Sequence, residues 1–144
     1  MRLTDFTDYT LRALIYLGVH RDELVTIQEI ADAYGISKNH LMKVAHQLGL
    51  LGVVVTMRGR GGWLRLSREP DAIRIGQVVR NVEFDLALAE CFDSRTNTCT
   101  ISPVCTLKGA LGKAREAFFA VLDDYTLEDL CRNESKLVRI LRQH

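Results

Sequence analysis

The sequence predicts a mainly α-helical protein with a small β wing, built as a winged helix-turn-helix head followed by a long helix. Three observations lead to this fold class. Two short helical patterns joined through a glycine are followed by a hairpin pattern with a glycine-rich tip, all within residues 26–66. Residues 104–125 then repeat apolar side chains at intervals of three and four. The length of 144 residues and the hydrophobic content of 47% suit one globular domain with an extension.

Caps and apolar spacing predict the first two helices. Thr4 or Thr7 can cap a first helix, in which apolar residues recur three and four positions apart. The run Thr-Ile-Gln-Glu from Thr26 to Glu29 is a capping box, because its hydroxyl and its carboxylate each accept a hydrogen bond from an amide at the start of a helix. We expect a second, short helix there that ends at a turn made by Gly35.

A third helix follows at once and completes a helix-turn-helix. Ser37 can cap it, and its apolar residues fall on one face: Leu41, Val44, Ala45 and Leu48. Polar and basic residues gather near its start: Lys38, Asn39, His40 and Lys43. In a helix-turn-helix the N-terminal side chains of the second helix meet base edges and phosphates in the major groove. We therefore predict DNA contacts from Ser37 and these four residues, with a plain αα-hairpin as the alternative.

The next segment predicts a β wing. A β-branched run at 53–57 and an apolar–basic alternation at 63–66 flank the sequence Arg-Gly-Arg-Gly-Gly, which is the pattern of a hairpin with a glycine-rich tip. Glycine lets a backbone approach a groove closely, and arginine supplies positive charge. We expect DNA contacts from three residues of this tip: Arg58, Arg60 and Gly61. A nucleotide-binding phosphate loop is the rival interpretation, but no Lys-Ser/Thr pair and no helix follow the glycines.

Charge is segregated along the chain, although the net charge is only +1. No acidic residue occurs from Ala33 to Arg68, and the same window holds these basic side chains: Lys38, Lys43, Arg58, Arg60, Arg65 and Arg68. Such segregation gives a nearly neutral protein one positive face, which suits the phosphates of double-stranded DNA. A solvated face without a partner is the alternative, but charge runs of that kind usually mix both signs.

The second half of the chain is predicted to be helical. We expect a helix over 71–83, a long helix over 104–125, and a short helix that Thr126 caps and that ends near Cys131. A compact head cannot cover the apolar side of the long helix, and exposing each large side chain costs about 1.5–3 kcal/mol. An antiparallel pair with the same helix of a second subunit would cover it, so the fold class includes a dimerisation helix. A homodimer also suits a palindromic operator.

Three cysteines, Cys91, Cys99 and Cys105, lie in a stretch rich in Thr, Ser, Asn and Pro, with seven and then five residues between them. The first residues lack the apolar run of a signal peptide, and no stretch is long enough to cross a membrane, so we expect a cytoplasmic protein with reduced thiols. Zinc sites usually contain closer cysteine pairs, whereas iron–sulfur clusters tolerate wider spacing. Spacing alone therefore leaves a metal centre or a thiol switch between Cys99 and Cys105 open.

Several short motifs, in this order and spacing, resemble the Rrf-type winged-helix iron–sulfur regulators. They are Phe-Thr-Asp-Tyr at 6–9, Leu-Arg-Ala-Leu at 11–14, the wing at 59–62, Ile-Arg-Ile-Gly at 73–76, and Cys-Thr-Ile-Ser-Pro-x-Cys-x-Leu at 99–107. The resemblance implies that Cys91, Cys99 and Cys105 ligate a 2Fe–2S or 4Fe–4S cluster, and that Asp8 of the partner subunit adds an oxygen ligand. Arg12, four residues after Asp8, can pair with it and would stand beside the cluster.

Within that family, the resemblance favours repressors that sense nitric oxide and control nitric-oxide stress genes. Another branch uses a histidine soon after the third cysteine, where this chain has Thr, Leu and Lys. The gap from Cys91 to Cys99 is longer than the family pattern, and Cys131 is extra to it. The resemblance divides the chain into a DNA-binding domain at 1–83, a cluster-binding loop at 84–106, and a dimerisation helix with C-terminal helices at 107–144.

Other functions remain as alternatives at this point. A winged-helix regulator could respond to another signal, such as cluster status or oxidants, with or without a metal. A small electron-transfer iron–sulfur protein would bind no DNA, which the acid-free window disfavours. No pairing of a nucleophile with a base stands out, so we predict that the protein is not an enzyme.

Overall fold

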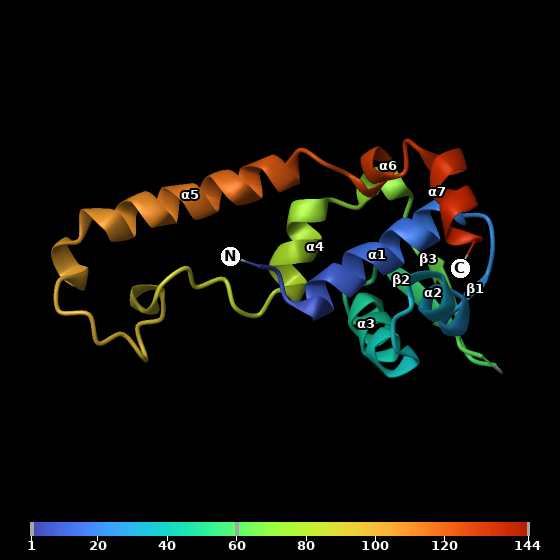
Figure 1. Ribbon diagram of the computed structural model, residues 1–144, viewed down its shortest axis with the longest axis horizontal. Helices are drawn as coiled ribbons and strands as arrows, with labels where there is room; N and C mark the ends of the chain where they lie inside the picture. The colour runs from blue at the N-terminus through green and yellow to red at the C-terminus, as the bar shows by residue number, and fades with distance from the viewer. Residues whose placement is uncertain (1, 60, 144) are drawn as a thin grey trace.

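A computed structural model describes residues 2–59 and 61–143 and places a helical head at one end of a long arm (Figure 1). The elements in chain order are α1 (Asp5–Val19), β1 (Val25–Thr26), α2 (Ile27–Tyr34), α3 (Lys38–Leu50), β2 (Val54–Met57), β3 (Trp63–Leu66), η1 (Pro70–Ala72), α4 (Ile75–Val82), η2 (Glu90–Phe92), η3 (Ser102–Val104), α5 (Thr106–Asp123), α6 (Leu127–Leu130) and α7 (Glu134–Leu141). The arm is α5, and the segment that carries the cysteines joins its far end to α4 (Figure 1).

The predicted caps of the first three helices are confirmed. The side chain of Thr4 accepts a hydrogen bond from the amide of Thr7, so Thr4 rather than Thr7 caps α1. Thr26 forms both halves of a capping box with Glu29. Gly35 ends α2 with φ +64°, a conformation that side chains rarely adopt, and the helix-turn-helix passes directly into α3.

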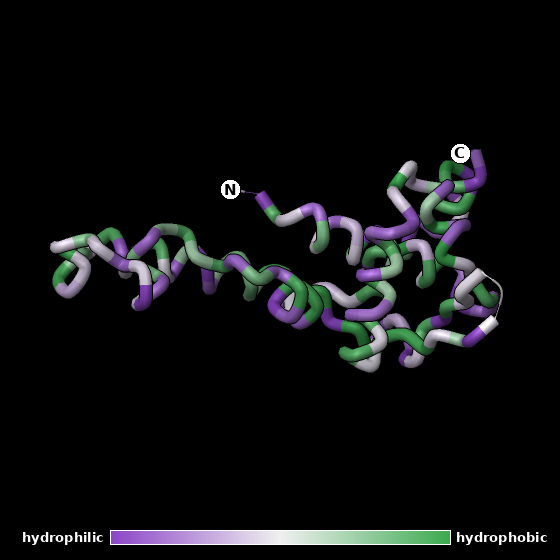
Figure 2. The backbone as a smooth tube through the Cα atoms, turned by 90° about the horizontal axis from the view of Figure 1, so that it is seen from below, coloured by the Kyte–Doolittle hydropathy of each residue, from purple (hydrophilic) through white to green (hydrophobic). Residues whose placement is uncertain are grey.

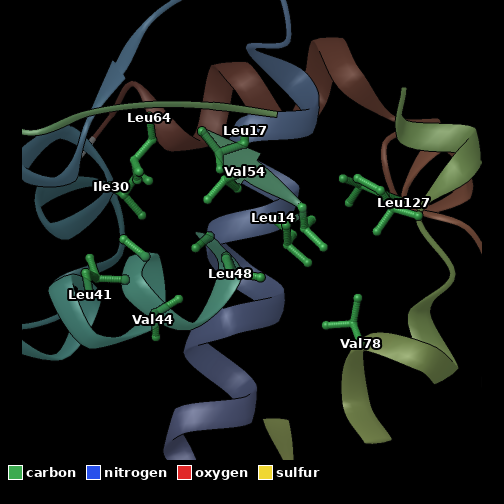
Figure 3. Close-up of a cluster of buried hydrophobic side chains, with 14 of the residues drawn as sticks. Leu14, Leu17, Ile30, Leu41, Val44, Leu48, Val54, Leu64, Val78 and Leu127 are labelled. Carbon is green, nitrogen blue, oxygen red and sulfur yellow. The ribbon is translucent and has the colours of Figure 1, made fainter. Parts of the chain in front are cut away.

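The core lies between α1, α2, α3 and the small sheet, and α1 runs through its middle (Figure 3). Leu14 and Leu17 of α1 are at most 1% exposed. Around them pack side chains from the other elements of the head: Ile30, Leu41, Val44, Leu48, Val54 and Leu64. Leu127 of α6 is also fully buried, and both α6 and α7 pack on α1. The C-terminal helices are therefore part of the body of the head.

The wing contains one strand more than the sequence predicted. The antiparallel sheet has the order β1-β3-β2, and β3 pairs on one side with β2 and on the other with β1. Val25 lies opposite Leu64, and Val54 lies opposite Leu66. A strand of two residues has no periodicity to reveal it, because its pairing partner is almost 40 residues away.

The helix predicted over residues 71–83 is wrong in its first half. A 3-10 turn ends at Ala72, Ile73 is extended, and the helix begins only at Ile75. The backbone here pairs with the segment before α6: the amide of Leu127 donates to the Ile73 carbonyl at 2.9 Å, and the amide of Ile75 donates to the Tyr125 carbonyl at 3.0 Å. These long-range hydrogen bonds outweigh the local helical pattern.

The arm is a single exposed helix, close to the predicted bounds. Of its residues, all of which are described, only Phe119 is buried, and it lies near the head. There the guanidinium of Arg80 stacks on the Phe119 ring at 4.5 Å and donates to Asp123 through Nη2 at 2.8 Å. Apolar and polar positions alternate along the arm (Figure 2). Among residues 2–59 and 61–143, no helix is long and apolar enough to cross a membrane.

Candidate metal centre and nucleic-acid interface

The loop with the three cysteines extends away from the head to the far end of the arm (Figure 1). Each of the four cysteines of the chain is a free thiol; Cys91, Cys99 and Cys105 are partly exposed, and Cys131 is buried. Cys105 caps α5, since its sulfur accepts a hydrogen bond from the amide of Lys108 at 3.4 Å. The N-terminus of a helix favours negative charge, so this position suits a thiolate ligand.

Local contacts hold the two other thiols in place. The Cys99 amide donates to the Asn97 side chain at 3.1 Å, which fixes the turn before that thiol. Next to Cys91, the ring of Phe92 lies under the guanidinium of Arg115 at 5.0 Å, and this contact fastens the loop to α5. The loop is therefore tied to the arm at both of its ends.

The described residues of one chain do not close a metal site by themselves. Nowhere among them do three His, Cys, Asp or Glu side chains gather closely enough to hold a metal ion. The donor set nevertheless fits an iron–sulfur cluster chemically, because three reduced and partly exposed thiols lie on one loop within fifteen residues. Such a site would need further ligands from outside this loop.

Asp8 lies on α1 in the head, whereas the cysteines lie on the loop that runs beside the arm and joins the far end of α5 at Cys105 (Figure 1). Its carboxylate is 44% exposed and pairs with Arg12, as predicted, with 2.8 Å between Oδ2 and Nη2. Arg12 in turn lies 6.0 Å above the ring of Tyr34, the last residue of α2. One chain therefore does not bring Asp8 to the cysteines, and it presents this carboxylate outward.

The predicted DNA-contacting residues of the third helix gather on one exposed surface. Lys38, Asn39, His40 and Lys43 all lie exposed on the first two turns of α3. Ser37 is exposed as well, but its hydroxyl accepts from the His40 amide at 3.2 Å and so serves mainly as the cap. The imidazole of His40 lies 5.8 Å from the ring of Tyr9, which follows Asp8 on α1.

The wing tip supplies a second exposed group. Arg58 is exposed at the end of β2, and Gly61 has φ +101°, which only glycine adopts without strain. Arg60, the third predicted contact at this tip, lies outside the described residues. The structure thus places exposed basic side chains on both α3 and the wing, as a winged helix that binds DNA requires.

Glu83 and Cys131 show what sequence reasoning did and did not find. Cys131, which the sequence marks as extra to the family pattern, is 3% exposed, and burial raises its pKa to about 11. Glu83 was not singled out, yet it is only 6% exposed and bonds to the first turn of α1. Its partners are more than 75 residues away, so no local pattern could reveal them.

Comparisons with known proteins agree with this arrangement. Residues 3–133 match the Rrf2 family, described as an iron-dependent transcriptional regulator. The chain is 53% identical to the HTH-type transcriptional regulator NsrR of Bacillus subtilis, over 99% of this chain and 98% of that protein. It is 46% identical to the protein of the same name in Geobacillus kaustophilus, over 99% and 98%.

Solved structures give the same fold. The T. potens IscR structure superposes with a TM-score of 0.73 at 25% identity, covering 92% of this chain and 88% of that one. CymR, described as the global cysteine regulator of B. subtilis, superposes with a TM-score of 0.72 at 26% identity, covering 90% and 95%.

Proposed function

Since the chain belongs to the Rrf2 family of iron-dependent transcriptional regulators, it is a transcriptional regulator rather than an enzyme. We propose that it is a homodimeric repressor, and that it releases its operator when nitric oxide reaches an iron–sulfur cluster. The observation that carries this proposal is the likeness to regulators named NsrR along almost the whole chain, including the cysteine loop. The proposal concerns four things: nitric oxide as the signal, the iron–sulfur cluster, the ligands of that cluster, and the homodimer.

The thiolates of Cys91, Cys99 and Cys105 would hold the cluster, and Asp8 of the partner subunit would complete it. When bound, the cluster supplies iron atoms that nitric oxide can attack. The three thiols are free, partly exposed and carried by one loop, and Cys105 caps the N-terminus of α5. A carboxylate is a harder ligand than a thiolate, so an iron held by Asp8 would be more open to substitution than one held by four cysteines.

The exposed face of α5 supports the homodimer. One stripe at helical spacing is both apolar and exposed: Leu107, Ala110, Ala114, Ala117 and Val121. The alanines let a second helix approach closely, while Leu107 and Val121, 64% and 58% exposed, offer large apolar side chains at the two ends. Burying each of these two large side chains would stabilise the dimer by about 1.5–3 kcal/mol.

The stripe is nearly symmetric about Ala114, because Leu107 and Val121 are each seven residues away from it. A two-fold axis at Ala114 would therefore pair Leu107 with Val121 of the partner subunit in an antiparallel arrangement. That arrangement lays the far end of each arm beside the head of the other copy. The cysteine loop would then meet α1 of the partner subunit, which is where Asp8 faces solvent.

The contacts of α1 offer a route from that site to the DNA surface. Asp8 binds Arg12, Arg12 lies over Tyr34 at the end of α2, and Tyr9 lies against His40 on α3. A ligand that takes Asp8 away from Arg12 would shift α1 against both helices of the helix-turn-helix. A coupling free energy of about 3 kcal/mol, within the usual range, would change operator affinity by roughly a hundredfold.

The test is an anaerobic purification followed by operator binding with and without nitric oxide. We expect coloured protein with iron and sulfide, tight binding to a palindromic double-stranded site, and a loss of about a hundredfold in affinity after nitric oxide. Iron and sulfide counts would separate the 2Fe–2S from the 4Fe–4S form. Colourless protein with stoichiometric zinc would contradict the cluster, and binding that responds to a thiol oxidant but not to nitric oxide would contradict the signal.

A further inference from the structure

We propose that Glu83 is a positioning residue for Asp8: its buried carboxylate ties the start of the cysteine loop to the first turn of α1 and so fixes how that helix presents Asp8 to the second subunit. This inference rests on the proposed function, because it assigns a role toward the cluster ligand. It adds a residue outside the ligand set and outside the DNA surface.

Glu83 receives three hydrogen bonds from the first turn of α1. Its Oε2 accepts from the Thr4 amide at 2.9 Å, from the Thr4 hydroxyl at 3.1 Å and from the Thr7 hydroxyl at 2.7 Å. Thr7 is fully buried, and Glu83 is 6% exposed. Hydrogen bonds to an ionised acceptor are about twice as strong as neutral ones, so this is a firm attachment.

The attachment also has an electrostatic component. The first amides of a helix lack partners within it, and the helix dipole favours an anion at that end. Burial by itself raises the pKa of Glu83, but the hydrogen bonds from Thr4, Thr7 and the backbone of Asp85 together outweigh it, and the pKa lies below its usual value. The group is therefore a carboxylate near neutral pH, and it stabilises α1 as a buried counter-charge.

Glu83 stands at a junction between the arm and the head. It is the residue after α4, and its own amide donates to the Val79 carbonyl at 2.9 Å. Helix α4 packs against α5, and the cysteine loop begins with the next residue, Phe84. The ring of Phe84 lies 6.0 Å from that of Phe6 on α1. Two consecutive residues at the loop entrance thus both contact the first turn of α1.

Thr7 and Asp8 are neighbours that face different ways. The Thr7 side chain points into the head toward Glu83, and Asp8 is 44% exposed. Adjacent residues of a helix project about 100° apart, so fixing the Thr7 side chain fixes the rotation of the turn that carries Asp8. Loss of the Glu83 contact would leave Asp8 on a turn that frays, and a frayed ligand holds iron less well.

Amide hydrogen exchange in cluster-free protein tests the attachment directly. Glu83→Gln keeps the shape but removes the charge, and we expect the hydrogen-bonded amides of Thr4, Thr7 and Asp8 to exchange about tenfold faster, the effect of losing one charge-assisted contact. The amides of α3 should keep their rates. Asp5→Asn is the matched control, because it removes an exposed first-turn carboxylate that pairs with Arg2 on the surface. Unchanged exchange in Glu83→Gln would overturn the proposal.

The cluster-loaded protein tests the connection to Asp8. The absorption and circular dichroism spectra of Glu83→Gln should shift toward those of Asp8→Ala, and its loss of colour in air should be several-fold faster than in wild type. In the Asp8→Ala background the same substitution should change neither, because the ligand it positions is gone. Equal effects in both backgrounds would mean a purely structural role for Glu83 and would overturn the proposal.

These outcomes are distinct from failure of the proposed function. Wild-type protein without iron and sulfide would overturn the cluster and the positioning role together. Wild-type protein with a normal cluster, combined with unaffected spectra in Glu83→Gln, would overturn the positioning role alone.

Discussion

The carboxylate of Asp8 is held by the guanidinium of Arg12 through two contacts, 2.8 Å between Oδ2 and Nη2 and 3.2 Å between Oδ1 and Nε. Asp8 therefore already has an ion-pair partner within its own chain. If Asp8 is also an iron ligand, Arg12 competes for it. An exposed pair four residues apart on a helix is worth only about 0.3–0.5 kcal/mol, so the competition is weak and easily reversed.

This competition predicts opposite effects of two substitutions on cluster lifetime. Asp8→Ala should shorten the lifetime of the cluster in air several-fold, because a ligand is lost. Arg12→Gln should lengthen it about twofold, as the weak pair predicts. The measurement is the decay of visible absorption after exposure to air, with Asp5→Asn as the control. A shorter lifetime in Arg12→Gln would show that Arg12 supports the ligand rather than competing for it.

The exposed basic residues predict the salt dependence of DNA binding. Lys43→Ala and Arg58→Ala should each weaken binding at all sequences and reduce the slope of log affinity against log salt by about one unit, because each loses one phosphate contact. Fluorescence anisotropy at several salt concentrations measures this slope. Lys113→Ala, an exposed lysine on the arm, should leave the slope unchanged. An unaltered slope in Lys43→Ala would place that side chain away from the phosphates.

The sequence reveals those parts of the structure that local chemistry determines. Ser37 and the box of Thr26 with Glu29 mark where helices begin, because a capping side chain bonds amides only three residues away. The pairing of β1 and the contacts of Glu83 depend on residues far along the chain, so no local pattern predicts them. Asp8 lies between these cases: its pair with Arg12 follows from spacing, whereas its role in a second subunit came only from a family resemblance.

The exposed apolar stripe of α5, which has Ala114 at its centre, predicts a substitution that would separate the two subunits. Ala114→Glu places a charge at the proposed two-fold axis, next to the same charge of the other copy, and should convert the dimer to a monomer. Sedimentation velocity of cluster-free protein gives the answer directly. Lys113→Glu, one residue earlier on another face, should remain dimeric. A dimer in Ala114→Glu would mean that this stripe is not the interface.

The close packing around Gly76 predicts that alanine substitutions at Gly76 and Gly109 change the stability of the protein in opposite directions. A Cβ at this position would lie 2.9 Å from the backbone nitrogen of Asp123, so α4 and the end of α5 meet there without room for a methyl group. Gly76→Ala should lower the free energy of unfolding by about 1–3 kcal/mol. Gly109→Ala, on the arm itself with nothing within 4 Å of its Cβ position, should raise the free energy of unfolding by about 0.5–1 kcal/mol. Thermal unfolding of both variants decides this, and equal melting temperatures would contradict the close approach.

Glu83 predicts how the stability of the cluster-free protein varies with pH. Its pKa is lower in the folded chain than in the unfolded one, so the unfolded state binds a proton more readily. Its contribution is complete above the unfolded pKa, near 4.3 for a glutamate, and disappears as the pH falls through the lower folded pKa.

The stability difference between wild type and Glu83→Gln should therefore be constant from about pH 5 to pH 8 and shrink at more acid pH. Urea unfolding at a series of pH values measures it, and Asp5→Asn again serves as the control for an exposed carboxylate on the same turn. A difference that persists unchanged at acid pH would contradict this charge-dependent prediction, and equal stability of the two proteins at every pH would mean that the shape of Glu83, rather than its charge, stabilises α1. In that case Gln should replace it at the start of the cysteine loop without any effect on Asp8.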